Sequence, residues 1–478
     1  MLGNVPAFLF AWLGSSYAGV ISVPLSYEQR GTVLESMLAQ SSPAMIITDL
    51  LTLAEAGTVI DSVPSIEKVV VVDGNTTGSM SAVDMIAPIV SYENFVSDKP
   101  IEASATQEHP HAGDTLSIMF TSGTTGGSKG VVCSHRMALG FAETAAWSLG
   151  LTGEDVSYTS LPLSHVNALY STFLASLLCE SEAVISRRFS VTRYWKEVKR
   201  SGATVASLLS SMATLLMRAT ASSDEQSHNL RMIISAPRPR DLVSFEKRFN
   251  ARVTEIYGLT DAGLPLGIPF GERAPAGACG KPAPNWECQL VDDDDNPVSP
   301  GAVGELVLRP LSPHLTMSSY WKQPDATVAA WRNLWLHTGD FMRTDADGWY
   351  YFVDRKKDLI RRFGENISTF DIEVTLAHHS AVAEVAAYAV ESEVTEQEVG
   401  VTVILRDEHG LGSAPEQELL RYCEANLPYF AVPRFWRIAT TLPRNASGKV
   451  LKRLLTADAM DESWDAGWRG RSKRTESR

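Results

Sequence analysis

The chain has 478 residues, of which 44% are hydrophobic and 21% are charged, and its formal net charge is −14. A length of several ordinary domains of about 100–150 residues, together with this hydrophobic fraction, indicates a globular protein with more than one structural unit. The acidic balance argues against a general nucleic-acid binder and against a protein held at a membrane by a polybasic surface.

The amino-terminal segment is apolar, but its pattern is not that of a membrane span. Pro6 and Pro24 lie within it, residues 14–16 interrupt it, and no basic residue precedes it, whereas a spanning helix needs roughly 20 uninterrupted apolar residues. We predict a buried helix over residues 5–17 and a short strand over 20–23. No targeting signal is visible and the cysteines form no CxxC pair, so the sequence favours a reducing compartment, the cytoplasm.

Apolar β-branched runs alternate with helical patterns through the first half of the chain. Residues 44–47 and 69–72 are typical of strands buried on both faces, which belong to parallel sheets covered by helices. Residues 117–120 predict another such strand, which runs into a glycine-rich loop. Helical patterns cover 138–149, 170–178 and 205–219. The first half therefore predicts an α/β fold of layered, mostly parallel sheets with helices.

The pattern changes after Gly280. Residues 288–291, 303–308 and 349–353 alternate between apolar and polar around turns, which predicts an antiparallel, β-rich subdomain. The acidic run at 292–296 is interpreted as a solvated hairpin tip, because the spacing and closing glutamate of an EF-hand calcium loop are missing.

From residue 355 the pattern resets to a small, mobile α+β domain. Its expected helices and strands are a helix at 368–378, strands at 384–390 and 401–405, and a helix at 416–425. We therefore divide the chain into a large amino-terminal domain, residues 1–354, and a carboxyl-terminal domain, residues 355–478, which meet at the basic joint 356–358.

The loop at residues 121–130 carries the sharpest local signal. It combines glycines, hydroxyl side chains and Lys129 directly after a strand. The backbone N–H groups of such a loop can approach phosphate oxygens, and the hydroxyls and the lysine add donors. It is not a Walker A loop, because Gly130 follows the lysine in place of the magnesium-binding Ser or Thr. We predict a phosphate-binding loop of another class than that of P-loop kinases and GTPases.

Three further segments place hydroxyls, glycine and charge together: 257–261, 337–340 and 443–449. Taken singly, the first two are explained as strand-to-turn transitions and the third as a solvated lysine on a loop. In this order and spacing, the four segments resemble the adenylate-forming superfamily of acyl-CoA synthetases, luciferases and peptide-synthetase adenylation domains. The resemblance covers essentially the whole chain, and it includes residues 161–165, 235–237, 301–306 and 354–358.

The resemblance implies that the chain binds ATP, and it assigns a part of the nucleotide to each motif. The β- and γ-phosphates would be held by Thr121, Ser122, Gly123, Thr124, Thr125, Gly126 and Lys129. Tyr257 would stack on the adenine, and the neighbouring nucleotide-binding residues would be Ser235, Ala236, Pro237 and Gly258. Asp340 and Arg355 would hold the ribose hydroxyls.

The resemblance also implies which residues serve the reaction. Lys449 would bridge the acyl carboxylate and the α-phosphate, Thr260 would contact the α-phosphate, and His165 would gate the channels of the acyl group and the pantetheine. Asp261 stands where the family usually has a glutamate that binds Mg²⁺, and it is one methylene shorter. Lys357 matches the hinge about which the small domain rotates between the two half-reactions.

The chemistry explains these residue types. A carboxylate is already ionised at pH 7 and needs no general base to attack the α-phosphorus, so the obstacle is the repulsion between two anions. Two unit charges about 4 Å apart interact by ~4 kcal/mol at an effective dielectric near 20. A lysine and a magnesium ion between them lower this repulsion. Pyrophosphate then leaves, an acyl-adenylate forms, and the thiol of coenzyme A displaces AMP.

The sequence departs from the family pattern at several places besides Asp261. Ser128 stands where proline is common, and residues 363–366 replace a frequent Gly-Gly pair near the pantetheine passage. The family usually carries further residues before the segment that aligns with Met1. The basic run at 355–362, including Arg361 and Arg362, is expected to assist at the phosphates of the nucleotide or of CoA.

The combined prediction is an ATP-dependent acyl-CoA ligase whose partners are a small carboxylic acid, ATP and CoA. Free CoA is favoured as acceptor because no carrier domain follows Lys449. An acyl-AMP ligase that delivers to a separate carrier protein, and a catalytically weak acyl-adenylate binder, remain as alternatives. A hydrolase is disfavoured, and a homodimer is left open.

The acid is predicted from three segments expected to line its pocket, 167–168, 210–213 and 262–263. Their side chains are small and mostly uncharged, and none is a lysine or arginine that would pair with a second carboxylate. Small side chains leave volume, so we expect a bulky, largely hydrophobic monocarboxylic acid. Residues 362–368 resemble carnitine-type CoA ligases, which leaves a short polar acid as the alternative.

Overall fold

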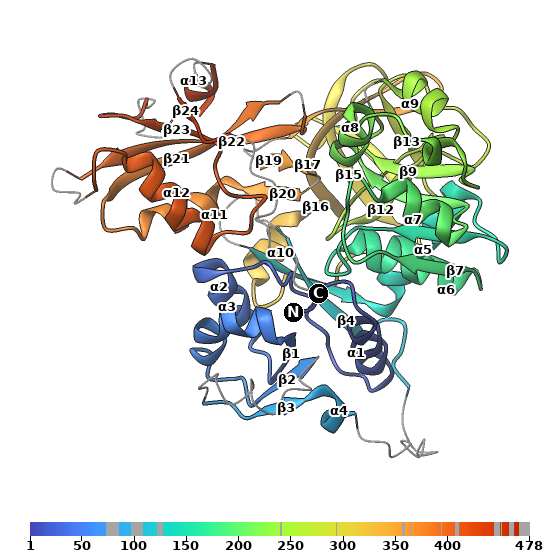
Figure 1. The fold of residues 1–478 in the computed structure, drawn as a ribbon. Coiled ribbons are helices and arrows are strands. Elements are labelled where there is room, and N and C mark those ends of the chain that lie inside the picture. The colour runs from blue at the N-terminus through green and yellow to red at the C-terminus, as the bar shows by residue number, and fades with distance from the viewer. Residues whose placement is uncertain are drawn as a thin grey trace.

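The computed structural model describes residues 1–72, 86–96, 109–121, 128–239, 241–292, 294–355, 359–363, 365–392, 394–406, 411–443, 450, 452–457 and 463–467. Figure 1 shows an amino-terminal body built around several sheets, with a smaller carboxyl-terminal domain, drawn in orange and red, lying across one side of it. No helix in these ranges is long and apolar enough to cross a membrane.

The amino-terminal end of the chain forms a parallel sheet in the order β1-β2-β3. Its strands are β1 (Met45–Asp49), β2 (Lys68–Val72) and β3 (Ile89–Ser91), and the neighbouring helices are α1 (Pro6–Tyr17), α2 (Gly31–Ser41), α3 (Leu50–Asp61) and α4 (Tyr92–Phe95). Val69, Val70 and Val71 are fully buried, as a strand covered on both faces requires. The predicted helix 5–17 and strands 44–47 and 69–72 are confirmed, whereas 20–23 makes only a single bridge, from Ser22 to Ser117.

The hairpin of β4 (Thr115–Thr121) and β5 (Lys129–Ser134) corrects the expectation for residues 117–120. That segment is a strand, but it pairs antiparallel with β5 and does not belong to a parallel sheet. Its burial pattern resembles that of a parallel strand because α5 (His135–Leu149) and neighbouring elements cover the hairpin. The loop between the two strands is the predicted phosphate-binding loop.

A five-stranded, wholly parallel sheet in the order β10-β9-β8-β6-β7 forms the centre of the amino-terminal domain. Its strands are β6 (Val156–Thr159), β7 (Glu182–Ile185), β8 (Val205–Leu209), β9 (Met232–Ala236) and β10 (Arg252–Thr254). The accompanying helices are the π-helix η2 (Asn167–Leu174), α6 (Ala175–Leu178), α7 (Tyr194–Ser201), α8 (Ser210–Arg218), the short 3₁₀ helix η3 (Ser223–Gln226) and α9 (Leu242–Phe249).

The predicted helix over 205–219 is wrong in its first part. Residues 205–208 are buried and form β8, and α8 begins only at Ser210. A short apolar run has the same composition in a buried strand and in a buried helix, so periodicity alone does not separate the two. The predicted helices 138–149 and 170–178 are confirmed, the latter as η2 and α6.

A second, antiparallel sheet follows the order β11-β12-β13-β18-β17-β15-β14, with β16 added beside β17, and confirms the predicted β-rich subdomain. Its strands are β11 (Ile256–Leu259), β12 (Gly263–Gly267), β13 (Ala278–Pro282), β14 (Trp286–Val291), β15 (Val303–Pro310), β16 (Trp331–Arg332), β17 (Trp335–Thr344) and β18 (Tyr350–Arg355). The helix α10 (Pro324–Ala330) precedes β16.

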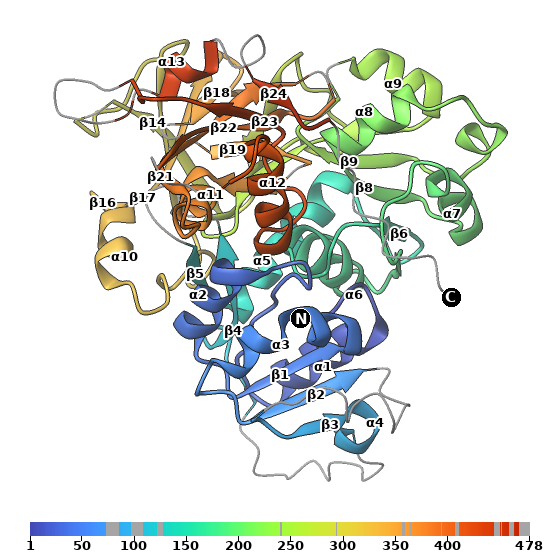
Figure 2. The ribbon, with the colours of Figure 1, turned by 60° about the vertical axis from the view of Figure 1, so that its left-hand side comes forward.

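The carboxyl-terminal domain is an α+β unit with its own core, in which Ile372, Leu376 and Trp436 are fully buried. Its elements are the hairpin β19 (Leu359–Arg362) and β20 (Glu365–Ser368), α11 (Thr369–Ala377), β21 (Val382–Glu391), β22 (Gln397–Leu405), α12 (Pro415–Asn426), β23 (Phe435–Ile438), α13 (Lys452–Ala457) and β24 (Trp464–Asp465). Figure 2 shows α11 and α12 above α2, which both of them contact. The two domains therefore pack against each other through helices as well as through the β19–β20 hairpin.

Candidate functional site

The carboxyl ends of the central parallel strands gather several predicted site segments at one edge. Thr159 of β6 lies beside Ser207 of β8, and Leu209 of β8 lies beside Ala236 of β9. The residues that follow these strands, 160–165, 210–213 and 237, therefore leave the sheet at the same edge. In open α/β sheets this is the edge where ligands bind.

Residues outside the predicted phosphate loop hold its two ends in position. Thr121 and Lys129 are paired across the β4–β5 hairpin, so both ends of the loop start from one place. Gln40 of α2 accepts a hydrogen bond from the Gly130 N–H (3.1 Å) and donates one to the Ser128 carbonyl (3.3 Å). Gln40 was not predicted from the sequence, because nothing in its local pattern distinguishes it from other polar residues of a helix.

The predicted ribose site brings three residues together. The Tyr257 hydroxyl donates to the Asp340 carboxylate at 2.5 Å, and the Asp340 side chain is almost wholly buried. Asp340 of β17 stands opposite Arg355 of β18 in the strand register. The turn before Asp340 is held by Glu305, which accepts the Gly339 N–H at 3.0 Å. The structure thus brings Tyr257, Asp340 and the backbone of Arg355 to one place.

Residues 235–237, the predicted adenine wall, lie next to a buried ion pair. Ser235 donates to the Pro237 carbonyl at 2.8 Å, and Arg238, the next residue, pairs with Glu255 at 3.0 Å. Burial raises the pKa of Glu255 to about 7, although the charge and hydrogen bonds of Arg238 lower it. This pair was not predicted. In the sequence, only the positions of the two residues point to this pair, since Arg238 follows the 235–237 segment and Glu255 lies just before Tyr257.

The β11–β12 turn carries Thr260 and Asp261. The turn is so tight that a Cβ on Gly258 would stand 2.3 Å from the Gly263 carbonyl oxygen, so only glycine fits there. Asp261 accepts a hydrogen bond from the Tyr320 hydroxyl at 2.5 Å. The Lys129 ammonium lies 4.5 Å from the centre of the Tyr320 ring, which links this turn to the phosphate loop.

The donor set at Asp261 fits Mg²⁺ bound together with a nucleotide. Within the described ranges, no three His, Cys, Asp or Glu side chains form a cluster that could hold a metal by themselves. Mg²⁺ does not need such a cage, because it keeps several waters and usually binds through one or two carboxylates plus substrate phosphates. A single aspartate linked to the predicted phosphate loop satisfies that requirement.

The carboxyl-terminal domain reaches the site through its β19–β20 hairpin and α11. Glu365 lies 3.1 Å from His165 Nε2, Arg361 donates to the Ala236 carbonyl at 3.2 Å, and Ser128 donates to Asp371 at 3.4 Å. The cavity enclosed between the domains near His165 measures about 90 Å³, well below the ~300–1,000 Å³ usual for small-molecule sites. The two domains are therefore closely docked.

Two groups at this contact have shifted pKa values. Burial lowers the pKa of His165, but the charge and hydrogen bond of Glu365, together with the charge of Glu28, outweigh it and raise the pKa above its ordinary value of 6.5. Burial raises the pKa of Asp371 to about 6, against which its hydrogen bond with Ser128 acts only in part.

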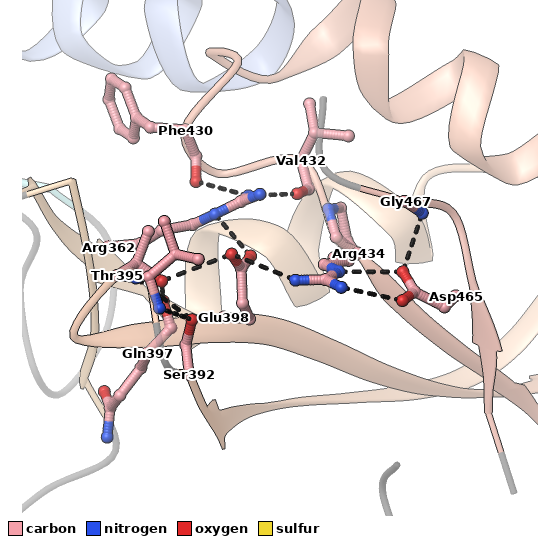
Figure 3. A network of polar contacts seen from close by, with 12 residues as sticks. Arg362, Ser392, Thr395, Gln397, Glu398, Phe430, Val432, Arg434, Asp465 and Gly467 are labelled. Atoms are coloured by element: carbon pink, nitrogen blue, oxygen red, sulfur yellow. Dashed lines mark hydrogen bonds and ion pairs between the residues drawn. The ribbon is translucent and has the colours of Figure 1, made fainter. Parts of the chain in front are cut away.

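Arg362 does not take the place expected for it at a phosphate. Its guanidinium is buried in the carboxyl-terminal domain, 2.7 Å from Glu398, and donates to the carbonyls of Phe430 (3.1 Å) and Val432 (2.8 Å). Figure 3 shows Glu398 between Arg362 and Arg434. Arg362 therefore has a structural role here, whereas its neighbour Arg361 faces the amino-terminal domain.

Some predicted residues lie outside the described ranges: Ser122, Gly123, Thr124, Thr125, Gly126, Lys357 and Lys449. His165 lies at the domain contact beside Glu365, Arg355 of β18 lies opposite Asp340, and the remaining residues fall into two groups. Thr121, Lys129, Thr260 and Asp261 lie on the hairpin and turn that Tyr320 links, and Ser235, Ala236, Pro237, Tyr257, Gly258 and Asp340 lie on the strands of the adenine and ribose side.

Comparison with known protein families gives the same answer as the geometry. The model of the AMP-binding enzyme family matches residues 1–321, and that of the AMP-binding enzyme C-terminal domain matches residues 371–449. The chain belongs to the AMP-binding enzyme family. This confirms the resemblance to the adenylate-forming superfamily that was inferred from the motifs.

Individual relatives of the family are more distant. The crotonobetaine/carnitine–CoA ligase of Salmonella paratyphi C is 28% identical over 464 residues, which are 95% of this chain and 87% of the relative. The amide bond synthetase McbA of Marinactinospora thermotolerans has a TM-score of 0.81 at 23% identity over 96% of this chain and 89% of that one.

A second solved structure, o-succinylbenzoate CoA synthetase of Bacillus subtilis, has a TM-score of 0.77 at 24% identity and covers 97% of this chain and 88% of that one. At these identities the solved structures show the fold, and they confirm the predicted arrangement of a layered α/β amino-terminal domain with a β-rich part and a small α+β domain.

Proposed function

We propose that this family member is an ATP-dependent acyl-CoA ligase, which converts a carboxylic acid into an acyl-adenylate and then transfers the acyl group to CoA. The supporting observation is the docking of the β19–β20 hairpin, which brings Arg361 to the adenine wall and Glu365 to His165. A domain that contacts the nucleotide side and the proposed acyl gate together is suited to a reaction with two successive transfers.

In the first half-reaction the protein has to hold two anions in line. In this proposal Tyr257 and Asp340 hold the adenosine, Lys129 and the phosphate loop bind the phosphates, and Lys449 is assigned to bridge the acid and the α-phosphate. When bound beside Asp261, a divalent cation neutralises part of the phosphate charge. The carboxylate oxygen bonds to the α-phosphorus and the bond to pyrophosphate breaks, which gives the acyl-adenylate. Positioning and electrostatics supply the rate.

In the second half-reaction the thiol of CoA, as thiolate, attacks the acyl carbon and AMP leaves with the bonding electrons. We assign the docked arrangement to this step, because Glu365 then holds His165 beside the passage. The domains, residues 1–354 and 355–478, exchange arrangements by rotation about Lys357. The two half-reactions need different geometries at the same adenylate, which a rotating domain provides.

For the acid we propose a bulky, largely hydrophobic monocarboxylate. The support is the small size of the side chains at 167–168, 210–213 and 262–263, and the lack of a lysine or arginine among them. The alternative is a short polar acid, which is favoured by the named activity of the Salmonella relative.

A separate carrier protein is the alternative to CoA as acceptor of the acyl group. Free CoA is supported by the absence of a long insertion between Asp340 and Arg355 and by the names of the relatives. A catalytically weak adenylate binder is disfavoured, because the sequence has Lys449, the residue proposed to act on the two reacting anions, as well as Asp340 and Arg355.

A screen of carboxylic acids tests the proposal. Each acid is incubated with ATP and Mg²⁺, pyrophosphate release is recorded, and CoA is then added while thioester is followed by mass spectrometry. Turnover of bulky apolar acids with thioester formation is expected. Exclusive turnover of short polar acids would refute the proposed acid class. Adenylate that reacts with a carrier protein but never with CoA would refute the acceptor, and no adenylate with any acid would refute the ligase.

A further inference from the structure

The segment from Thr316 to Tyr320 connects two parts of the nucleotide site. On one side it runs along β5, where the Ser318 N–H donates to the Val132 carbonyl and the Val132 N–H donates to the Ser319 carbonyl, both at 3.0 Å. A backbone bridge also joins Val131 to Tyr320. The segment is therefore registered on the strand that follows the phosphate loop.

The other end of the segment is tied to the β11–β12 turn. The Thr316 hydroxyl and the Met317 N–H both donate to the main-chain carbonyl of Asp261, at 2.9 and 3.1 Å. The backbone of Asp261 is thus fixed relative to β5, although the two belong to different sheets.

The Tyr320 side chain also connects Asp261 with Lys129, through its hydroxyl and its ring. Its hydroxyl donates to Asp261 Oδ2 at 2.5 Å, and its ring lies under the Lys129 ammonium at 4.5 Å from the centroid. The tyrosine is 7% exposed, so packing restrains its ring. Asp261 Oδ1 receives no hydrogen bond from any residue that the structure describes.

We propose that Tyr320 is a positioning residue for the cation of the ATP complex: it occupies one oxygen of Asp261 and so directs the other toward the metal, at a fixed distance from Lys129. The inference rests on the proposed function, since it requires that the site bind ATP. The side chain of an aspartate is one methylene shorter than that of a glutamate, so metal binding depends more on a fixed orientation of its carboxylate. Residues that orient a metal ligand from behind typically contribute 10–100-fold to metal affinity.

Calorimetric titration of ATP into the full-length protein, with Mg²⁺ and with EDTA in its place, separates the metal from the nucleotide. We expect Tyr320→Phe to raise the Mg²⁺ concentration needed for half-maximal ATP binding about tenfold, while binding of ATP in EDTA stays unchanged. Tyr158→Phe is the matched control, because it also removes a phenol that donates to a carboxylate, that of Glu197 at 2.9 Å.

The Asp261→Asn background tests the route of the effect. There Tyr320→Phe should cause no further change in the Mg²⁺ requirement, because the carboxylate on which the tyrosine acts is gone. An additional loss in that background, or an unchanged Mg²⁺ requirement of Tyr320→Phe alone, would overturn the inference. If Tyr320→Phe does not fold, Asp261→Asn alone decides: its Mg²⁺ requirement must rise, and an unchanged one overturns the proposal. Failure of the unaltered protein to bind ATP under either condition would instead contradict the proposed function.

Discussion

The carboxylate of Asp340 is 1% exposed and accepts the hydroxyl of Tyr257. Burial of an ionised carboxylate is costly unless hydrogen bonds replace its water, so the two side chains depend on each other. We therefore propose two tasks for Tyr257, to present its ring to the base and to keep Asp340 oriented for the ribose.

Tyr257→Phe separates these tasks, because it keeps the ring and removes the hydroxyl. A hydrogen bond to a charged group contributes about 1.5–3 kcal/mol, so we expect the KM for ATP in pyrophosphate release to rise at least about tenfold. Tyr351→Phe, which removes a phenol that donates to Asp345 at 2.6 Å, is the control and should leave the KM unchanged. An unaltered KM in Tyr257→Phe would show that the Asp340 contact does not serve ATP.

Lys449→Ala tests the positive charge that we propose to act between the two anions. We expect adenylation to fall about 100-fold or more, since removal of one stabilising donor commonly costs a factor of 10²–10³, while thioester formation from supplied acyl-adenylate is less affected. The control is Lys452→Ala, which removes a nearby lysine that pairs with Glu373 at 2.7 Å. Equal losses in both half-reactions would contradict the assigned role.

At the scale of elements, β19 and β22 are joined by a buried charge cluster. Arg362 of β19 and Glu398 of β22 are 2% and 0% exposed, and Arg434 and Asp465 continue the cluster toward the surface. Figure 3 shows the alternation of charges from Arg362 to Asp465. The pair holds the β19–β20 hairpin, which carries Glu365 and Arg361 to the other domain.

Glu398→Gln leaves the Arg362 guanidinium buried without a counter-charge. Loss of one partner of a buried ion pair costs about 3–5 kcal/mol, so we expect the free energy of unfolding of the carboxyl-terminal domain to fall by about that amount in chemical denaturation. Glu391→Gln, at an exposed position on β21, should change it by less than about 0.5 kcal/mol. An equally small effect at Glu398 would show that the hairpin does not depend on the cluster.

At the scale of the whole molecule, the contact between the domains contains groups that titrate near neutrality. The pKa of Asp371 is raised to about 6 by burial, and that of His165 is raised by Glu365 and Glu28 against the effect of burial. In both cases the docked form holds its proton more tightly than the undocked form. Docking is therefore strongest below the ordinary pKa values and weakens as the pH rises through the raised ones.

We expect the docked fraction to fall as the pH rises through about 6, where Asp371 loses its proton, and to fall further above 6.5, the ordinary pKa of histidine, where His165 loses its proton. Energy transfer between one dye on each domain measures this fraction. Asp371→Asn should remove the fall of the docked fraction that Asp371 causes near pH 6. Glu365→Gln should reduce the fall at higher pH that His165 causes. A docked fraction that rises with pH would contradict the sign expected from these two groups.

Local patterns in the amino-acid sequence were enough to predict the chemical motifs and their order. The glycine–hydroxyl–lysine loop, the Tyr257 and Asp340 motifs and the change of pattern after Gly280 are local features, since each depends on neighbours in the chain, and the fold bears out the elements around them. The same local basis explains the error at 205–219, where a buried strand and a helix follow each other with no glycine, proline or charged residue between them.

Which side chain faces which partner depends on the folded chain and could not be predicted from local patterns. Arg361 and Arg362 are indistinguishable by composition, but successive residues of a strand point to opposite faces, so one reaches Ala236 and the other is buried against Glu398. Tyr320 and Asp261 are 59 positions apart, and no periodicity spans that distance. Their contact exists because a third segment folds between two sheets, which the chain specifies only through its complete packing.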